Sequence, residues 1–209
     1  TPVLLDAEWK AVEGSKYFGT PYLYKENGFK EREKAEELIA YLKEEPPLEA
    51  KVLSKEKKKE TKNPPLLYNL AELQNDCSKM CKISPDETLK VVQELYEKKL
   101  VTYPRTDARV LSTAVAKEIY KNINGLMRYE PMAGFAKEAM NLGSFKGIAK
   151  TRYVNDKQIT DHYAIIPTGQ GMGNLRGLSP LSEKVYQVVC RRFLSIFYPA
   201  AIYQKYSLV

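Results

Sequence analysis

The sequence predicts an α+β fold in which a mainly helical region follows a shorter region of mixed strand and helix. Three observations carry this prediction. Short strand-like runs surround one amphipathic helix in residues 1–64, helix starts with apolar helical spacing recur in 65–200, and residues 201–209 read as a strand. The break Asn63-Pro64-Pro65 separates the first two regions. We therefore expect domain boundaries after residues 64 and 200.

The first region is predicted from its apolar spacing and its turn residues. Trp9 to Val12 and Tyr17 to Tyr24, joined through Gly14-Ser15, are typical of a short hairpin or meander. Apolar residues at helical spacing predict an amphipathic helix from Glu31 to Glu44. The alternation from Leu48 to Val52 predicts a half-buried strand.

The second region is predicted to be helical because capping residues precede its apolar runs. Ser84, Pro85 and Glu87 form a strong start signal, with Ser as the N-cap and Pro in the first turn. The expected helices cover 66–77, 84–99, 113–123 (capped by Ser112 or Thr113), 133–140 and 182–196. The first two helices, followed by an extended segment, indicate a helix-turn-helix or winged-helix layout.

Composition places the 209 residues among ordinary globular chains, with 44% hydrophobic and 28% charged residues. No apolar run approaches the roughly 18 residues that span a bilayer, and no signal peptide is present, so no membrane contact is expected. Three cysteines in a Lys-rich chain favour reduced thiols and a cytoplasmic location. Cys77 and Cys81 lack a nearby His or second Cys pair, so no zinc site is expected. The Thr start and strand-like end predict a fragment of a longer protein.

The net charge of +7 and pI near 9.1 are compatible with a polyanionic partner. The run from Lys55 to Lys62 is interpreted first as a solvated linker or edge-strand face, and second as a DNA contact. Gly169 to Gly177 is expected to be a flexible loop, because no Lys-Ser/Thr and no preceding strand make it a phosphate loop. Arg191 and Arg192 are expected to face solvent or a neighbouring element.

The first indication of a catalytic role is the stretch Tyr103-Pro104-Arg105, which sets a possible nucleophile beside a phosphate-binding side chain. A Tyr hydroxyl, with an ordinary pKa near 10, is a weak nucleophile at neutral pH unless positive charge or a base assists it. Arg105 keeps its charge and presents a planar fork that matches phosphate oxygens in pairs. Pro104 restrains Tyr103 to an extended or turn conformation. On these residues alone, a turn with a half-buried ring is the commoner outcome.

The single histidine, His162, lies in Asp161-His162-Tyr163-Ala164-Ile165-Ile166-Pro167-Thr168. Solitary histidines are usually structural. Here a carboxylate precedes the ring and could orient it, and an apolar run ending in Pro follows it, which suits a side chain presented from a rigid support.

Three collinear blocks together resemble the type IA DNA topoisomerases, and the topoisomerase III branch most. They are Pro65-Leu66-Leu67-Tyr68-Asn69-Leu70-Ala71-Glu72-Leu73-Gln74, then Tyr103-Pro104-Arg105-Thr106-Asp107 after Leu95-Tyr96-Glu97, and the His162 block. The resemblance covers residues 48–205. It implies part of a β-rich arch domain in 1–64, the tyrosine-bearing helical domain in 65–200, and a return strand into the arch from 201.

The resemblance implies an enzyme that cleaves and rejoins single-stranded DNA without ATP, allowing strand passage, relaxation and decatenation. Tyr103 would be the nucleophile that forms a 5′-phosphotyrosine, Arg105 would stabilise the phosphoryl oxygens, and His162 would position Tyr103 or the DNA backbone. The implied DNA or interdomain contacts are Gln93, Glu97, Thr102, Asp107 and Arg109. A bacterial, nucleoid-associated cytoplasmic location follows from the same resemblance.

Two positions depart from the family pattern: Ala108 stands where Ser is common, and Tyr163 replaces the second His of a common pair. The family's Mg²⁺ ligands lie in a Toprim domain, and its Asp-x-Asp-x-Glu cluster is absent from this sequence. The implied partners are therefore single-stranded DNA and the Toprim and remaining arch domains. We expect this chain alone to bind no Mg²⁺ and to be inactive in relaxation.

Three alternatives remain at this stage. A tyrosine recombinase or type IB topoisomerase also uses Tyr on phosphate, but gathers Arg and His before a late Tyr and forms a 3′ linkage. A winged-helix DNA-binding module without catalysis would leave Tyr103 as a packing residue. An interdomain scaffold without DNA contact would show no steep salt dependence of DNA binding.

Overall fold

The computed structural model describes residues 8–44 and 54–208. The chain divides into two compact units, one of residues 1–57 with 206–209 and the other of residues 58–205. Within the described ranges, no helix is long and apolar enough to span a bilayer.

The first unit is held by a small aromatic cluster beside a two-stranded sheet. β1 (Leu23–Lys25) pairs antiparallel with β2 (Gly28–Phe29), and α1 (Arg32–Leu42) follows. Phe29 stacks on Trp9 with ring centroids 5.4 Å apart, and Tyr17 meets Phe29 edge-on at 5.0 Å.

The prediction of a strand over residues 9–12 was wrong, and only the end of the 17–24 run is a strand. Turns occupy much of this stretch, and its aromatic side chains pack on one another instead of alternating across a sheet. The helix predicted over 31–44 is confirmed as α1, although it contains no buried residue. The strand predicted at 48–52 lies outside the described residues.

The second unit is mainly helical, and two of its helices begin where capping residues predict. Ser84 caps α3 by accepting a hydrogen bond from the Glu87 amide, and Ser112 caps α4 in the same way. The helix predicted from residue 66 begins instead at Leu70, because Asn69 accepts from the Glu72 amide and caps it there. The helices are α2 (Leu70–Cys81), α3 (Pro85–Glu97), α4 (Thr113–Leu126), α5 (Glu130–Leu142) and α6 (Pro180–Ser195). Short 3₁₀ helices η1 (Ser144–Lys150), η2 (Asp156–Gln158) and η3 (Met172–Gly177) connect them.

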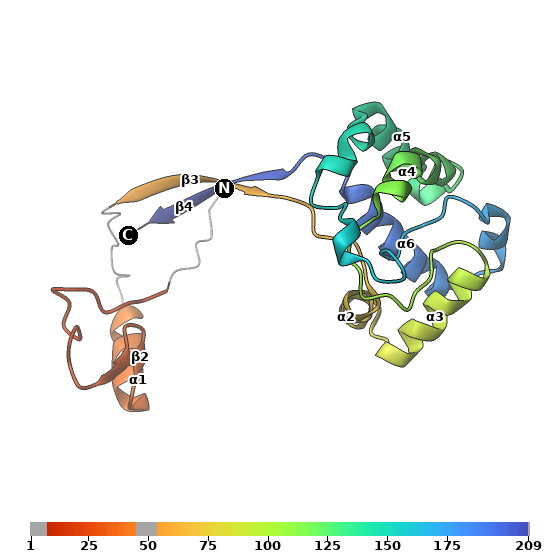
Figure 1. Ribbon diagram of the computed structural model, residues 1–209. Helices are drawn as coiled ribbons and strands as arrows, with labels where there is room; N and C mark the ends of the chain where they lie inside the picture. Colours follow the sequence, from red (N-terminus) through yellow and green to blue (C-terminus); the bar gives the residue numbers. More distant parts are fainter. Residues whose placement is uncertain (1–7, 45–53, 209) are drawn as a thin grey trace. The chain divides into compact units, whose positions relative to one another are not determined.

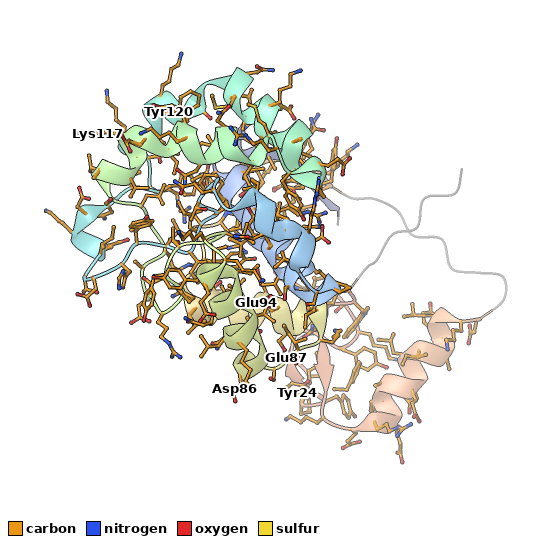
Figure 2. All side chains as sticks on the ribbon, turned by 90° about the vertical axis from the view of Figure 1, so that its right-hand side faces the viewer. Tyr24, Asp86, Glu87, Glu94, Lys117 and Tyr120 are labelled. Atoms are coloured by element: carbon orange, nitrogen blue, oxygen red, sulfur yellow. The ribbon has the colours of Figure 1, made fainter. Side chains whose placement is uncertain are left out.

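Helix α6 forms the centre of this unit (Figure 1). It packs against α2, α3 and α5, and most of its apolar residues are buried. It begins at Pro180 with Ser179 as the N-cap, two residues earlier than predicted. The outer faces of α3 and α4 carry exposed Asp86, Glu87, Lys117 and Tyr120 (Figure 2). The unit is therefore a helical core with a charged, solvent-facing surface.

Extended segments cross this helical core and touch through isolated antiparallel bridges. Tyr68 pairs with Ile165, and Val101 pairs with Pro167. These bridges bring together three stretches that lie far apart in the sequence: the residues before α2, those after α3, and the block after His162.

Two strands lead into and out of the helical core. β3 (Lys55–Lys62) pairs with β4 (Ala201–Leu208), and the two lie side by side (Figure 1). All eight β3 residues are exposed, so the Lys-rich run is an exposed strand face, as the first interpretation held. The strand predicted at the chain end is confirmed over 201–208.

The segment from Gly169 to Gly177 is not the flexible loop that was predicted. It contains η3, and Asn174 donates from its amide to the Lys98 carbonyl at 2.9 Å. Gly169, at φ +73°, lies so close to α4 that a Cβ there would fall 2.8 Å from the Asn122 carbonyl oxygen. A Cβ on Gly125 would meet the Gly169 backbone at 2.0 Å, so the loop and the helix touch backbone to backbone.

Candidate functional site

An open pocket of about 560 Å³ contains both residues singled out as reactive, Tyr103 and His162. It lies where the segment after α3 runs beside the His162 block. The lining comprises Tyr96, Glu97, Lys99, Val101, Thr102, Tyr103, His162, Tyr163, Thr168 and Gln170. The structure thus brings together two side chains that are 59 positions apart.

Tyr103 and His162 are in ring contact. Their centroids lie 4.4 Å apart with an interplanar angle of 43°, while Tyr96 meets Tyr103 edge-on at 5.4 Å. Tyr103 is half-buried and His162 is exposed, so solvent or a ligand reaches this contact. The phenol is held by rings on two sides and remains accessible.

Thr102 fixes the backbone next to Tyr103. Its hydroxyl donates to the Ala164 carbonyl and accepts from the Ile166 amide, both at 3.0 Å. Its own amide donates to the Ile166 carbonyl at 3.0 Å. Pro104, on the other side of Tyr103, is buried. Tyr103 therefore projects from a backbone that is anchored immediately before and after it.

Thr106 performs the same task for His162, and the sequence reasoning did not assign it a role. Its buried hydroxyl donates to the His162 carbonyl at 2.8 Å and accepts from the Ala108 amide at 3.1 Å. The sequence feature that could have indicated this role is the position of Thr106 inside the Tyr103 block. A small hydroxyl in a tight extended segment is suited to bridging backbone groups that would otherwise be unpaired.

Of the other predicted residues, Glu97 and Thr102 line this pocket, whereas Gln93, Arg105, Asp107 and Arg109 are not part of its lining. Arg105 is exposed, and within the described residues no hydrogen bond or ion pair engages its guanidinium. Glu97 lines the pocket and accepts a long, 3.4 Å hydrogen bond from the Gln93 amide. Asp107 is exposed, and its backbone carbonyl accepts from the Asn69 amide at 3.1 Å.

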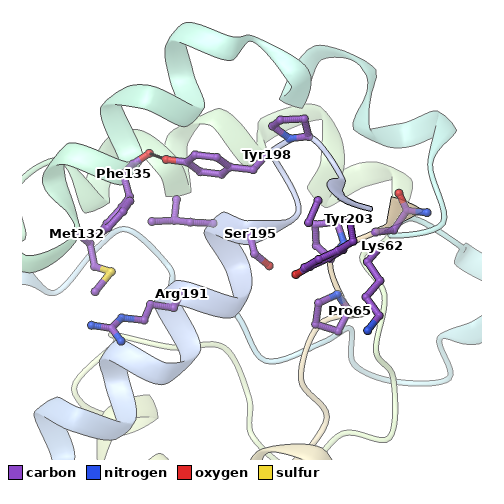
Figure 3. Close-up of a pocket in the computed structure, with 13 residues that line it drawn as sticks. Lys62, Pro65, Met132, Phe135, Arg191, Ser195, Tyr198 and Tyr203 are labelled. Carbon is purple, nitrogen blue, oxygen red and sulfur yellow. Dashed lines mark hydrogen bonds between the residues drawn. The ribbon is translucent and has the colours of Figure 1, made fainter. Parts of the chain in front are cut away.

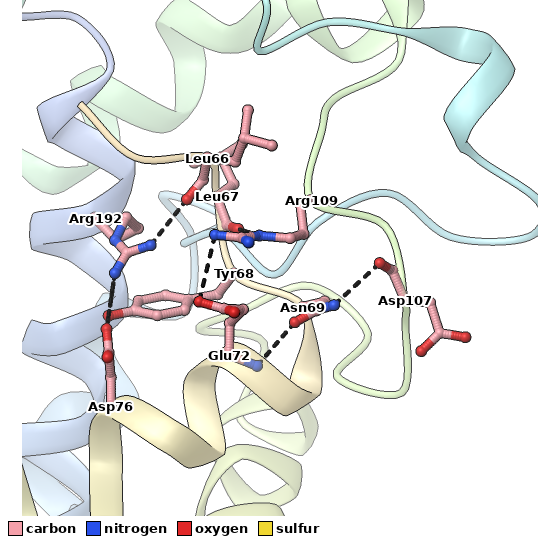
Figure 4. A network of polar contacts seen from close by, with 9 residues as sticks. All are labelled: Leu66, Leu67, Tyr68, Asn69, Glu72, Asp76, Asp107, Arg109 and Arg192. Atoms are coloured by element: carbon pink, nitrogen blue, oxygen red, sulfur yellow. Dashed lines mark hydrogen bonds and ion pairs between the residues drawn. The ribbon is translucent and has the colours of Figure 1, made fainter. Parts of the chain in front are cut away.

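Arg109 reaches away from the pocket toward the segment before α2. It donates to the Leu67 carbonyl at 3.2 Å and forms an ion pair with Glu72 at 3.4 Å. Figure 4 shows the Arg109 contacts next to the Asn69–Asp107 hydrogen bond. Both connect the segment before α2 to the segment that carries Tyr103.

Arg192 anchors the same segment from the other side (Figure 4). Its guanidinium lies 4.1 Å from the Tyr68 ring centroid, donates to the Leu66 carbonyl at 2.9 Å and pairs with Asp76 at 2.7 Å. Tyr68 also donates to Asp76 at 2.6 Å, and burial with this bond raises the pKa of the Tyr68 hydroxyl. Arg192 thus faces a neighbouring element, one of the two predicted environments, while Arg191 is exposed.

The donor set around Tyr103 does not suit a metal ion. Mg²⁺ prefers several carboxylate oxygens, and Glu97 is the one carboxylate in the pocket lining as described. In residues 8–44 and 54–208, no group of three or more His, Cys, Asp or Glu side chains could hold an ion. Burial raises the pKa of Tyr163, so this phenol stays protonated at neutral pH.

Comparison with known proteins gives this pocket its context. The sequence profile of a family described as DNA topoisomerase matches residues 6–209. The chain belongs to the type IA DNA topoisomerases. The matched range of this topoisomerase chain includes both the Tyr103 block and the His162 block.

The relatives of this topoisomerase chain include proteins named DNA topoisomerase 3. The Bacillus subtilis protein is 40% identical over 148 residues, which cover 69% of this chain and 19% of the relative. The Bacillus thuringiensis (strain Al Hakam) protein is 36% identical over 163 residues, covering 76% and 21%. The chain thus spans about a fifth of the length of these relatives.

A solved structure of full-length topoisomerase I from Thermotoga maritima has a similar fold. The TM-score is 0.55 at 22% sequence identity, over 88% of this chain and 28% of that one. This similarity supports the mainly helical α+β fold that the sequence predicts.

Proposed function

We propose that this chain supplies the nucleophile and the phosphate-binding groups of a topoisomerase III-like enzyme. The observation that carries the proposal is the contact between Tyr103 and His162 in an open pocket, 4.4 Å between centroids. In this proposal, residues 65–200 are the tyrosine-bearing, winged-helix-like domain, and residues 1–64 and 201–209 belong to a β-rich arch.

In the proposed reaction, the Tyr103 oxygen attacks a backbone phosphate of single-stranded DNA. An O–P bond to the tyrosine forms, the P–O3′ bond breaks, and the departing 3′ oxygen takes up a proton. The phenol releases its own proton as it attacks. Religation reverses these steps, so the bond energy is retained in the phosphotyrosine and no nucleotide hydrolysis is required.

The state of each side chain supports its proposed role. Arg105 is exposed and free of ion pairs within the described ranges, so its fork is available to phosphoryl oxygens. His162 is exposed beside the phenol, where it can donate to the DNA backbone or orient Tyr103. Thr106 holds His162 through its carbonyl and acts as a positioning residue.

The proposed DNA contacts differ in how free they are to bind. Glu97 lines the pocket and is exposed, the partly buried Gln93 donates to it, and Asp107 is exposed outside the lining. We propose a supporting role for Thr102, because its hydroxyl proton is already donated to Ala164 and phosphate oxygens require a donor. Arg109 would have to leave Glu72 to reach a phosphate.

The type IA family depends on Mg²⁺ in general. Because the described residues offer no suitable ligand set, no step of the proposed reaction passes through a metal on this chain. We propose that a separate metal-binding domain completes the site, and that this chain by itself binds single strands without relaxing DNA. Mg²⁺-dependent relaxation by the isolated chain would contradict this part of the proposal.

The test places residues 58–205, which form one compact unit, into Bacillus subtilis DNA topoisomerase 3 in exchange for its matched segment. We expect the chimera to relax negatively supercoiled plasmid and Tyr103→Phe to reduce relaxation below detection. With oligonucleotides labelled at one end, a 5′-phosphotyrosine retains the 3′-labelled piece on the protein. A chimera that binds single strands without forming this adduct, or a Phe variant that still relaxes plasmid, would overturn the proposal.

The second candidate function is a DNA-binding module in which Tyr103 only packs against Tyr96 and His162. Unchanged relaxation by the Tyr103→Phe chimera would favour it. An interdomain scaffold is distinguished from both, because binding of single-stranded DNA to this chain should weaken steeply with salt if phosphates are contacted.

A further inference from the structure

A second and larger cavity, of about 790 Å³, lies in the helical unit away from the Tyr103 pocket (Figure 3). It is formed by α5, the end of α6, the end of β3 with the residues that follow it, and the start of β4 with the residues that precede it. Its lining comprises Lys62, Asn63, Pro64, Pro65, Met132, Phe135, Arg191, Leu194, Ser195, Tyr198, Pro199, Ala201 and Tyr203. None of these residues belongs to the lining of the Tyr103 pocket.

The interior of this cavity offers mainly apolar surface, and in the described residues only the Asn63 amide and the Tyr203 hydroxyl are uncharged polar side-chain groups of the lining without a hydrogen bond. Ser195 donates its hydroxyl to the Arg192 carbonyl at 2.7 Å, and the Tyr198 hydroxyl lies 2.9 Å from the Phe135 carbonyl that accepts from it. Both hydroxyl protons are therefore committed within the protein. Phe135 is 53% exposed, which is a large unburied aromatic area for a helix packed against its neighbours. An apolar side chain entering the cavity would gain burial and would compete with no internal hydrogen bond.

The charged residues that line the cavity have one sign. Arg191 and Lys62 are both exposed at its edge, and the residues that line it include no Asp or Glu. Arg191 makes no ion pair with any residue of the described ranges, and Lys62 lies 5.7 Å from the Tyr203 ring centroid. Glu138, which is outside the lining, lies 3.0 Å from the Tyr198 hydroxyl and shares its single proton with the Phe135 carbonyl. The cavity therefore favours a ligand that carries negative charge next to an apolar group.

We propose that this cavity binds a short peptide segment of a partner protein, in which one or two apolar side chains lie next to carboxylates. The apolar side chains would enter between Phe135 and Leu194, and the carboxylates would meet Arg191 and Lys62. A volume of about 790 Å³ falls in the range that ordinary ligand pockets have. The proposal goes beyond the Tyr103 chemistry and does not depend on it.

A nucleotide fits the same cavity less well. Bases are recognised through hydrogen bonds on their edges or through stacking along a basic groove. The Ser195 and Tyr198 hydroxyl protons are already engaged, which leaves the Asn63 amide and the Tyr203 hydroxyl as the uncharged polar groups of the described lining that could read a base edge. An apolar cavity with a two-cation rim matches an acidic, apolar peptide in both shape and charge. Single-stranded DNA is accordingly the competing occupant that the experiment has to distinguish.

The experiment selects binders to the purified 209-residue chain from a library of random displayed octapeptides. Selected peptides are then measured by fluorescence anisotropy. We expect enrichment of aromatic or Leu residues adjacent to Asp or Glu, and a loss of affinity when those acids are replaced by their amides. Selection of no peptide, or of peptides without acidic enrichment, would overturn the proposal.

Three variants locate the binding site. Phe135→Ala should weaken the peptide about tenfold or more, because it removes the apolar wall, and Arg191→Gln should weaken it about fivefold. Arg176→Gln, an exposed arginine on η3 outside the cavity, is the matched control and should leave affinity unchanged. All three changes are at exposed side chains, and thermal unfolding confirms that each variant is folded. Wild-type peptide affinity in both cavity variants would refute the site.

A competition with oligothymidine separates the two occupants. Peptide binding that persists at a saturating oligothymidine concentration supports the peptide site. If oligothymidine displaces the peptide, and Phe135→Ala and Arg191→Gln weaken oligothymidine as much as peptide, the cavity is a nucleic-acid contact and the proposal fails.

Discussion

Helices α1 and α3 have similar lengths and both carry apolar residues at helical spacing, but their surroundings are very different. α1 has 11 residues and none of them is buried, whereas α3 has 13 residues and buries Thr88, Val91, Val92 and Leu95. α3 packs against α2 and α6, while α1 packs against the short strand β2. Apolar spacing thus creates a face that can be buried, and the partner elements determine whether it is.

The irregular segments of the two units also differ in the contacts that hold them. The residues that precede α1 are held by ring contacts among Trp9, Tyr17 and Phe29. The segments that carry Tyr103 and His162 are held by partly buried side-chain hydrogen bonds over 56 to 64 positions in the sequence. The two side chains proposed to act on DNA thus lie where irregular backbone is anchored by long-range contacts.

The largest effect is expected from shortening a leucine in each of the two helices. Leu95→Ala in α3 removes a fully buried side chain and should cost about 2–5 kcal/mol of unfolding free energy. Leu38→Ala in α1 should cost no more than about 1 kcal/mol, because Leu38 is only partly buried. Urea unfolding measures both, with far-UV circular dichroism reporting mainly on the helical unit and the single tryptophan, Trp9, on the other. Equal losses would contradict the comparison.

The next effect concerns two neighbouring arginines on α6. Arg192→Met removes the ion pair with Asp76 and the bond to the Leu66 carbonyl, and should cost about 2–3 kcal/mol. Arg191→Met is the matched control and should be nearly neutral, because Arg191 is exposed. Urea unfolding of the two variants decides the prediction, and a neutral Arg192→Met would show that the network contributes no net stability.

A smaller effect is expected at the threonine that holds His162. Thr106→Val leaves the His162 carbonyl and the Ala108 amide without their partner and should cost about 1–2 kcal/mol. In the chimera it should also reduce DNA cleavage, and hydrogen exchange of the 162–166 backbone should accelerate. Thr160→Val, at an exposed threonine of the same segment, serves as the control. Unchanged exchange and cleavage would remove the positioning role.

The smallest effect is a pH dependence at the start of α4. The Asp156 carboxylate accepts from the Thr113 amide at 2.8 Å and from its hydroxyl at 2.5 Å, and these bonds lower the pKa of Asp156. A carboxyl whose folded pKa lies below its unfolded value stabilises the fold above the unfolded pKa, near 3.9, and this contribution disappears as the pH falls through the folded pKa. Between pH 6 and pH 3, Asp156→Asn should therefore lose less thermal stability than the wild type. Identical losses would exclude this contribution.

The sequence predicts local features of this fold better than contacts between distant segments. The starts of α3 and α4 follow from Ser84 and Ser112, because capping involves residues three positions apart. The start of α6 was predicted two residues late, although Ser179-Pro180 repeats the signal of Ser84-Pro85. Its capping hydroxyl accepts from the Ser182 amide, which places the helix start before Ser182.

The candidate site shows the same limit. Spacing alone could not place His162 beside Tyr103, and that pairing was expected only from the family resemblance. The role of Thr106 was not predicted, because its hydrogen bond spans 56 positions and leaves no periodic pattern in the sequence. Trp9 and Tyr17, which pack on Phe29, were predicted to lie in strands because β-strands and ring clusters favour the same residue types.

The backbone contact between Gly125 and Gly169 connects α4 to one wall of the Tyr103 pocket, although α4 is remote from the pocket in the sequence. Thr168 and Gln170, on either side of Gly169, line the pocket, whereas Gly125 lies on a helix that contributes no lining residue. A single methyl group on Gly125 would therefore act as a wedge between helix and loop and would move one wall of the pocket. Side-chain size at this remote position is a means of changing the width of the pocket while every residue in its lining stays the same.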